Sequence, residues 1–409
     1  MGNHKKLVVI GGGAAGFFCA VNAARLHPEW KVTLLEKSNR VLSKVKVSGG
    51  GRCNVTHAAE SISSMAKGYP RGESFLKKAF HHFGPEDTVQ WFESRGVNLK
   101  TESDGRMFPV TNSSQSIIDC LLNEAAKYQV EVKMLCAVEQ LRRDKNQWII
   151  QLNNQQVIVA DAVCIATGGH PKASSYDWLK NLGHTIIPPI PSLFTFNMVG
   201  HPLNELMGIA HDASVKLKGT KLQQQGPVLI THWGLSGPAI LKLSAFAARI
   251  LHEMDYHFTV IVNWLPEYNQ QTLSEQMQDY RTSLASRKIY GKNPFQLPAR
   301  LWELALQQCG INEMLRWSDV PAKAMHKMVN WLTALELTMK GKTTFKEEFV
   351  TAGGVPLAEV DMQTMQSKQQ PGLYFAGEVL DVDGITGGYN FQNAWTTGWL
   401  VANALERNI

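Results

Sequence analysis

The first residues of this 409-residue chain that could do chemistry are closely spaced glycines followed by an acid. Gly11, Gly13 and Gly16 follow an apolar run directly as Gly-x-Gly-x-x-Gly, and Glu36 stands twenty residues after Gly16. In such a motif the glycines permit a tight turn, backbone approach to a pyrophosphate and close helix–strand packing. N–H groups at a helix start attract phosphates, and the acid accepts hydrogen bonds from a ribose. The spacing predicts a dinucleotide-binding site.

A strand–helix–strand unit must position these residues. The apolar run from Lys6 to Ile10 predicts a buried parallel strand, residues 14–26 predict a helix, and "KVTLLE" predicts a second strand ending at Glu36. An N-terminal unit of this kind suits FAD and NAD equally. The alternative is a structural βαβ unit with a bare glycine turn.

The stretch from Ser48 to Asn54, "SGGGRCN", is the second candidate. Glycines without Cβ let a backbone touch a cofactor, and Arg52 can balance phosphate charge. A flexible surface turn is the alternative. Cys53 is a candidate proton donor, with a small buried thiol beside the cofactor as the other interpretation.

Two further strand ends complete the pattern. "DAVCIATGGHP" (161–171) and "LYFAG" before Glu378 both end in small residues, and "GGYN" (387–390) opens a helix. Cofactors bind at the carboxyl edge of doubly wound sheets. Glu378 can accept hydrogen bonds from ribityl hydroxyls, and a helix N-terminus stabilises negative charge on a reduced flavin. NAD would not need this second site, so the combination favours FAD.

Several stretches resemble one known family. "VSGGGRCNVT", "GRMFPVTNSSQSIIDCL", "ATGGHPKASS", "THWGLSGPAIL", "VTAGGV" and "GLYFAGEVLDVDGITGGYNFQNAW" look like the BaiN/YhiN/RdsA-like NAD(P)/FAD-dependent flavoprotein oxidoreductases, in family order over residues 5–404. The resemblance implies an α/β fold: a Rossmann-like, glutathione-reductase-like FAD domain with an inserted region. It also implies reduction of an activated C=C bond, in an unsaturated steroid ketone or in ribosomal RNA uridine, by an ene-reductase.

The motifs and the resemblance together predict the site. The catalytic candidates are Cys53, His232 and Tyr389, and no metal ligands are expected. The predicted cofactor-binding residues are Gly11, Gly13, Ala14, Ala15, Gly16, Glu36, Lys37, Ser48, Gly49, Gly50, Arg52, Cys53, Asn54, Val138, Ala166, Thr167, Gly168, Gly377, Glu378, Asp383, Gly387, Gly388, Tyr389, Asn390 and Phe391.

The chain divides where prolines cluster in "HTIIPPIPSLFTF". Residues 1–190 and 342–409 are expected to form one discontinuous FAD domain, 191–265 a β-rich insert, and 266–341 a helical lid. The last predicted helix has Asp319 as N-cap and continues through "ALEL". "THWGLSGP" is expected to face the substrate, or else to be a capped turn before a helix at Pro238.

Composition narrows the class of protein. Apolar residues are 44% of the chain and charged residues 19%, and no run of about 18 apolar residues occurs, so a cytoplasmic protein without a membrane span is expected. The six scattered cysteines form no C-x-x-C, which argues against a zinc ribbon or a redox dithiol. A net charge of +6 suits a polyanionic partner such as ribosomal RNA, although solubility explains it as well.

Three functions remain open on the sequence. They are a FAD-dependent reductase of RNA uridine, a reductase of a small enone, and a FAD-containing RNA-binding or assembly protein. No second Gly-x-Gly-x-x-Gly occurs, so NAD(P)H is expected to bind only transiently as electron donor. The oligomeric state stays open.

Overall fold

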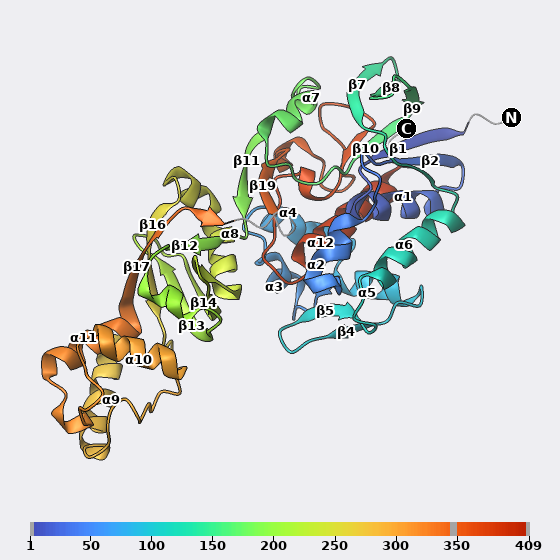
Figure 1. The fold of residues 1–409 in the computed structure, drawn as a ribbon. Coiled ribbons are helices and arrows are strands. Elements are labelled where there is room, and N and C mark those ends of the chain that lie inside the picture. The colour runs from blue at the N-terminus through green and yellow to red at the C-terminus, as the bar shows by residue number, and fades with distance from the viewer. Residues whose placement is uncertain (1–3, 344–349, 406–409) are drawn as a thin grey trace. The chain divides into compact units, whose positions relative to one another are not determined.

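A computed structural model of the chain shows two units, one inserted into the other (Figure 1). Unit 1 comprises residues 1–192 and 346–409, and unit 2 comprises residues 193–345. The structure describes residues 4–343 and 350–405. Each unit buries its own apolar core.

A five-stranded parallel sheet forms the centre of unit 1. Its strand order is β20 (Leu373–Phe375), β10 (Ala162–Ile165), β1 (Lys5–Ile10), β2 (Trp30–Leu35) and β6 (Glu131–Lys133). Val8 pairs with Thr33 on one side and with Val163 on the other. Buried residues fill β1 and β10 almost completely, as expected for parallel strands covered on both faces.

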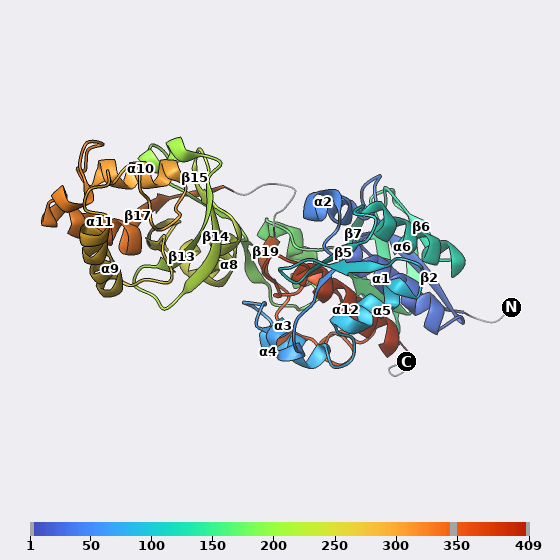
Figure 2. The same ribbon diagram turned by 90° about the horizontal axis from the view of Figure 1, so that it is seen from below.

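Two helices that are far apart in the sequence lie side by side in unit 1. They are α1 (Ala14–Leu26) and α12 (Tyr389–Ala404), and they lie together in both views (Figures 1 and 2). A Cβ added at Gly398 would lie 2.8 Å from the carbonyl oxygen of Ala15, so only glycine permits this closeness. The C-terminus of the chain thereby completes the unit that the N-terminus begins.

Smaller elements surround this sheet. The helices are α2 (Ser43–Gly51), α3 (Ile62–Ala66), α4 (Glu73–Ala79), α5 (Pro85–Glu93), α6 (Gln115–Lys127) and α7 (Asp177–Lys180). One three-stranded sheet has the order β3 (Thr56–His57), β5 (Arg106–Pro109) and β4 (Leu99–Thr101). A second has the order β7 (Val138–Asp144), β8 (Gln147–Leu152) and β9 (Val157–Ala160). Antiparallel β11 (Ile187–Ser192) and β19 (Val350–Gly354) stand on either side of the insert in the sequence.

Unit 2 is an antiparallel sheet with helices. The strand order is β17 (Leu335–Lys340), β16 (His257–Asn263), β13 (Ala210–Leu217), β14 (Gln223–Ile230), β15 (Gly234–Ser236), β12 (Thr195–Asn197) and β18 (Lys342–Thr343). Its helices are α8 (Pro238–Glu253), α9 (Gln270–Ser283), α10 (Ala299–Gln308) and α11 (Ala322–Ala334). Side chains from residues 191–265 and from 266–341, which the sequence analysis separates, share one core.

The end of the helical region differs from its prediction. Helix α11 begins after Pro321, and Asp319 lies in a preceding 3-10 turn instead of capping the helix. The chain then continues as β17, because Leu337 and Met339 alternate with polar residues and are buried in the core. Pairing with β16 overrides the helical tendency of "ALEL".

Three observations bear on the class of protein. Within residues 4–343 and 350–405, no helix is both long and apolar enough to cross a membrane. Within the same ranges, His, Cys, Asp and Glu side chains form no group of three or more that could hold a metal ion. All six cysteines are free thiols.

Candidate functional site

The carboxyl edge of the parallel sheet brings the predicted loops together. Strands β1, β2 and β10 end next to Gly11, Glu36 and Ala166 respectively, and β20 ends two residues before Gly377. A Cβ at Gly11 would lie 2.3 Å from the Ala166 carbonyl oxygen, and one at Gly377 would lie 2.8 Å from the Ala15 Cβ. Four stretches of sequence thus meet at one edge, as the strand order requires.

The glycines at the start of α1 have different environments. Gly16 packs so closely that an added Cβ would lie 1.9 Å from the Gly11 carbonyl oxygen, whereas at Gly13 nothing lies within 4 Å. Gly13 is the N-cap of α1, and Ala14 and Ala15 form the first turn. The backbone at this helix start is therefore open to a phosphate group.

Glu36 follows β2 directly, at the edge where Gly12 lies. Its Oε2 accepts a hydrogen bond from Gly12 N at 2.9 Å, and its Oε1 accepts one from Ser38 N at 2.8 Å. Each carboxylate oxygen keeps capacity for a second donor such as a ribose hydroxyl. Lys37 is the next residue and is exposed. Val138, the first residue of β7, lies near Glu36 in the structure, because the N–H of Cys136, two residues earlier, donates to the Glu36 carbonyl.

The stretch from Ser48 to Asn54 leaves the helical path of α2 at its glycines. Gly49 and Gly50 have φ of 57° and 68°, and nothing lies within 4 Å of a Cβ added at Gly50. The buried amide of Asn54, oriented so that both its ends are satisfied, accepts a hydrogen bond from Gly388 N at 3.1 Å. This stretch therefore contacts the start of α12.

Arg52 is held by protein groups. Its Nη1 donates to Glu102 Oε1 at 2.6 Å, and its guanidinium lies 3.9 Å from the centre of the Phe108 ring. A contact of Arg52 with a phosphate group stays a prediction. The stacking and ion pair of Arg52 order the glycine stretch.

The thiol of Cys53 is shielded from solvent. The residue is 0% exposed, and its backbone lies in the left-handed region with φ of 60°. Burial raises the pKa of this thiol to about 12, and a hydrogen bond with Ser48 offsets part of the rise. A neutral, enclosed thiol fits the packing interpretation, and a substrate cannot reach it unless the chain moves.

Glu378 lies between the connecting strand β19 and the loop after β10. Its Oε2 accepts from Lys44 Nζ at 2.7 Å, and its Oε1 accepts from Thr351 N at 3.1 Å. Gly168 and its neighbour Gly169 face this carboxylate, and the half-buried Thr167 precedes them. A second donor can still reach each oxygen, as the ribityl prediction requires.

Two residues here were missed in the sequence analysis, Lys44 and His170. Burial lowers the pKa of His170, and the positive charges of Lys37 and Lys44 lower it further, while Glu378 opposes them. The two lysines therefore place positive charge at the edge where phosphates are expected. Lys44 lies in α2, a helix for which the sequence analysis made no prediction, so no face was available on which to place it.

Glycines and aromatic rings frame the start of α12. Gly387 and Gly388 have φ of 109° and 95°, and a Cβ at Gly388 would lie 2.4 Å from the Thr56 carbonyl oxygen. Tyr69 donates its hydroxyl to the Tyr389 carbonyl at 2.7 Å. Burial raises the pKa of Tyr389 above its ordinary value, so its phenol is protonated at neutral pH.

His57 is a further residue that the sequence analysis missed. Its ring lies 4.9 Å from that of Tyr389, and its Nδ1 is 3.1 Å from the Gly387 carbonyl oxygen. A surface cavity of about 410 Å³ opens beside it, lined also by Pro85, Val89 and Gln90 of the α5 region. In the sequence His57 is a single histidine after "CNVT", and a single histidine does not predict a contact with the start of α12.

Three further predicted cofactor-binding residues have contacts with other parts of the protein. Asn390 bonds both backbone groups of Gly384, and Phe391 stacks on Trp395 with ring centroids 5.8 Å apart, so both order the helix start. Asp383 is buried in an ion pair with Arg71, which gives both of its carboxylate oxygens protein partners. Its contact with the cofactor stays a prediction.

His232 belongs to unit 2. It is exposed on the turn between β14 and β15, with its ring centroid 4.1 Å from that of Trp233. Gly237, which directly follows β15, is the N-cap of α8, which starts at Pro238. The turn before a helix is thus present, and a catalytic part for His232 stays a prediction.

The parallel sheet and its glycine loops define a Rossmann-type α/β protein. The chain belongs to the family described as HI0933-like protein Rossmann domain, whose sequence model matches residues 5–404. The chain is 29% identical to a 3-dehydro-bile acid delta(4,6)-reductase of Clostridium scindens over 98% of each chain. It is also 29% identical to the ribosomal RNA dihydrouridine synthases of Haemophilus influenzae, over 100% of each chain, and of Escherichia coli, over 97% of each.

Solved structures share the fold. A 3-ketosteroid delta1-dehydrogenase of Sterolibacterium denitrificans matches with a TM-score of 0.51 at 12% identity, covering 98% of each chain. A quinol fumarate reductase of E. coli matches with a TM-score of 0.50 at 16% identity, over 98% of this chain and 71% of that one. The family places the chain among flavoprotein-type oxidoreductases.

Proposed function

We propose that the chain is a FAD-dependent oxidoreductase that reduces an activated C=C bond, with uridine in ribosomal RNA as its substrate and dihydrouridine as its product. One observation supports FAD as the cofactor. Four loops of small residues meet at one edge of the sheet, and the backbone is open at Gly13, Gly50 and Gly168. These residues fit a dinucleotide, because a Cβ would meet few atoms at each of the three positions.

Each loop has a distinct task in holding FAD. The start of α1 at Gly13 binds the pyrophosphate, and Glu36 binds the adenosine ribose. Lys37 and Lys44 offset phosphate charge, and Glu378 accepts hydrogen bonds from ribityl hydroxyls. The N-terminus of α12 stabilises negative charge next to Gly387 and Gly388. FAD supplies a hydride to the substrate when bound, and NAD(P)H is the proposed transient donor.

A proton must also reach the substrate, and Tyr389 is the favoured donor in unit 1. Its phenol is protonated at neutral pH, and it lies at the start of α12. Cys53 is disfavoured because it is fully buried. His232, which is exposed on unit 2, is the next candidate.

The relatives support the choice of substrate. Two of them are named as ribosomal RNA dihydrouridine synthases and match the chain over almost their whole length. The sequence pI of about 8.9 suits a polyanion in a cytoplasmic setting. The relative named as a bile acid reductase supports the second candidate, reduction of a small enone. A FAD-containing RNA-binding or assembly protein is the non-catalytic alternative.

Mass analysis of ribosomal RNA from a strain lacking the gene tests the proposal. The expected result is loss of a two-dalton mass increase at one uridine or more, restored by the wild-type gene. Unchanged RNA, combined with reduction of an unsaturated steroid ketone by the purified protein, would favour the enone instead. Absence of flavin reduction by NADPH or NADH would leave the non-catalytic alternative.

A further inference from the structure

The chain passes from unit 1 into unit 2 through a very short junction. Ser192 is the last residue of β11 and of unit 1. Phe194, two residues later, donates its backbone N–H to Ser244 Oγ of α8 at 3.0 Å within unit 2. Leu193 alone separates these two anchored residues.

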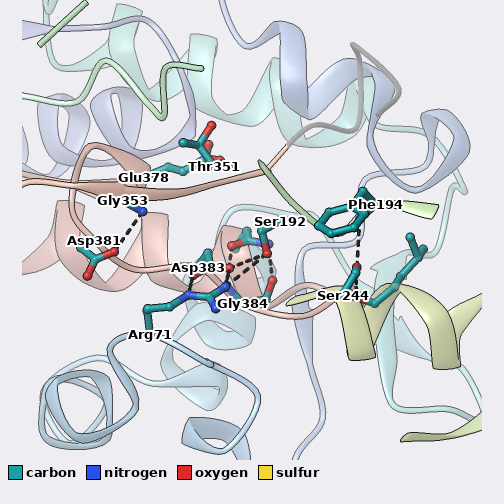
Figure 3. A network of polar contacts seen from close by, with 12 residues as sticks. Arg71, Ser192, Phe194, Ser244, Thr351, Gly353, Glu378, Asp381, Asp383 and Gly384 are labelled. Carbon is teal, nitrogen blue, oxygen red and sulfur yellow. Dashed lines mark hydrogen bonds and ion pairs between the residues drawn. The ribbon is translucent and has the colours of Figure 1, made fainter. Parts of the chain in front are cut away.

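A buried ion pair holds the end of β11. Arg71 donates from Nε and Nη2 to the carboxylate of Asp383, and Ser192 Oγ donates to Asp383 Oδ2 at 2.6 Å (Figure 3). Arg71 Nη2 also lies 3.3 Å from Ser192 Oγ. Asp383 is 0% exposed and Arg71 is 9% exposed, so water does not compete for these bonds.

The same stretch holds β19, the strand that follows the insert. Asp381 Oδ1 accepts from Gly353 N at 2.9 Å, as Figure 3 shows, and Glu378 accepts from Thr351 N. The acidic residues of "GEVLDVDG" therefore bind both strands that flank the insert. A motif that reads as cofactor contacts in the sequence also anchors these strands.

Asp383 is joined directly to the start of α12. Its neighbour Gly384 donates its N–H to Asn390 Oδ1 at 2.8 Å, and the Asn390 amide donates back to the Gly384 carbonyl at 3.0 Å. Ile385 N donates to the Gly68 carbonyl, three residues before Arg71. Ser192 is therefore connected to the first turn of α12 through Asp383, its neighbour Gly384 and Asn390.

The junction residue has an uncommon backbone. Leu193 has φ of 57°, in the left-handed region, and its side chain is half-buried. Such a conformation costs of order 1 kcal/mol for a residue with a Cβ, and it persists only where its surroundings impose it. Hydrogen bonds hold the residues on either side of it, Ser192 within unit 1 and Phe194 within unit 2.

We propose that Asp383 and Arg71 are positioning residues that clamp the junction at Leu193 and couple it to the start of α12. This inference rests on the proposed function, because the start of α12 is where that function places the flavin. The pair fixes the chain where the insert begins, and it acts on the reaction through the helix start without touching the substrate.

Hydrogen exchange on the full chain with FAD added tests the clamp. Ser192→Ala removes the two hydrogen bonds of the Ser192 hydroxyl, a short one to Asp383 and a longer one from Arg71, and leaves the ion pair. We expect amide exchange to rise about fivefold at Ile187, Ile190 and Ser192, the residues of β11 that carry an amide hydrogen, and in residues 384–392. A fivefold rise corresponds to loss of the short bond to Asp383. Asp177→Asn, which disturbs the exposed pair with Lys180 in the same unit, is the control and should change neither segment.

The junction has its own matched pair of variants. Leu193→Gly should keep wild-type exchange, because glycine adopts a left-handed backbone freely. Leu193→Ile has the same volume but is β-branched, so it should raise exchange in both segments. If Ser192→Ala raises exchange in residues 187–192 and leaves residues 384–392 unchanged, the coupling to α12 is wrong. If Leu193→Gly and Leu193→Ile exchange equally, the proposal that the backbone at Leu193 is clamped is wrong.

Comparing the FAD dissociation constant with kcat distinguishes a positioning role from simple structural support. In Ser192→Ala, the FAD dissociation constant should stay unchanged while kcat for uridine reduction falls about fivefold, and Ser192→Thr, which keeps the hydroxyl, should recover it. An equal loss of FAD affinity would overturn the positioning role. If wild type reduces no uridine, the proposed function fails, whereas the exchange experiment still decides the clamp.

Discussion

Burial changes what individual side chains can do, and Cys53 is the clearest case. Its thiol has a pKa of about 12 and no exposed surface, whereas Cys136 is half-buried. We expect iodoacetamide at pH 8 to modify Cys136 in the native protein and to leave Cys53 unmodified until denaturant is added. Peptide mass mapping measures both, and rapid native labelling of Cys53 would contradict its enclosed position.

The proton-donor hypothesis gives a second test at this scale. Cys53→Ala should keep substrate turnover within about twofold, while Tyr389→Phe should lower it about a hundredfold, a typical contribution of a general acid. Single-turnover oxidation of reduced flavin by substrate measures the step. A strong loss in Cys53→Ala with an unchanged melting temperature would restore the thiol as the acid.

Glu36 offers a cofactor test. Glu36→Ala removes a pair of charge-assisted bonds to the ribose, each worth roughly 1.5–3 kcal/mol, so FAD affinity should fall by about two to four powers of ten. The variant also frees Gly12 N and Ser38 N, which adds to the loss. A fluorescence titration measures it, with Glu60→Ala on the exposed surface as control. Unchanged affinity would show that another residue holds the ribose.

Sequence reasoning worked at this scale where position in a strand decided the outcome. Gly11, Glu36 and Glu378 follow strand ends, and strand ends of a parallel sheet share an edge. It did not identify the protein partners of Arg52 and Asp383, because these partners, Glu102 and Arg71, lie 50 and 312 residues away. No local sequence pattern predicts an ion-pair partner that far away in the chain.

At the scale of elements, the start of α1 distinguishes two glycines that look alike in the sequence. Gly13→Ala meets nothing within 4 Å, so the protein should fold with a normal melting temperature but bind FAD more weakly. Gly16→Ala would place its Cβ 1.9 Å from a carbonyl oxygen, so α1 and β1 must separate and stability should fall. Thermal melts with and without FAD separate the two effects, and equal melting temperatures would contradict them.

Ser367, His184 and Glu359 hold two loops of unit 1 together. Ser367 Oγ accepts hydrogen bonds from two backbone N–H groups, so its hydroxyl donates to His184 Nε2, and His184 Nδ1 donates to Glu359 at 2.7 Å. The arrangement is that of a hydrolase triad, but the serine oxygen is enclosed and fully bonded. It is a structural link, with no free nucleophile.

This link predicts a pH effect. Burial opposes ionisation of Glu359, but hydrogen bonds from Thr185 and His184 outweigh it and lower the pKa of Glu359 below 4.5. Its contribution is therefore present above pH 4.5 and lost as pH falls through the lowered pKa. Glu359→Gln should cost about 1–3 kcal/mol at pH 7 and less at pH 3. Urea unfolding measures this, with the exposed Glu336→Gln as control.

The elements that could be predicted are those with a strong local period. The helix from Ala14 to Leu26 has the predicted bounds, and the predicted helix after Gly237 is α8. Residues 335–340 could not be predicted, because a short run with leucines suits a helix or a strand until its partner is known. That partner, β16, is supplied by the tertiary fold.

At the scale of the whole molecule, the two separate cores predict two unfolding events. FAD is proposed to bind unit 1, so by linkage it should raise only that unit's transition, by about 2.7 kcal/mol at a hundredfold excess over its dissociation constant. Calorimetry with and without FAD measures this. A single transition that shifts as a whole would show that the units unfold together.

The packing of α12 on α1 has a consequence for synthesis on the ribosome. Unit 2 is complete in the growing chain at residue 345, while unit 1 still lacks β20 and α12. The apolar side of α1 that receives α12 has no partner until the final residues emerge. The residues of the insert therefore leave the ribosome before unit 1 has all the strands and helices of its core, so the insert can fold first.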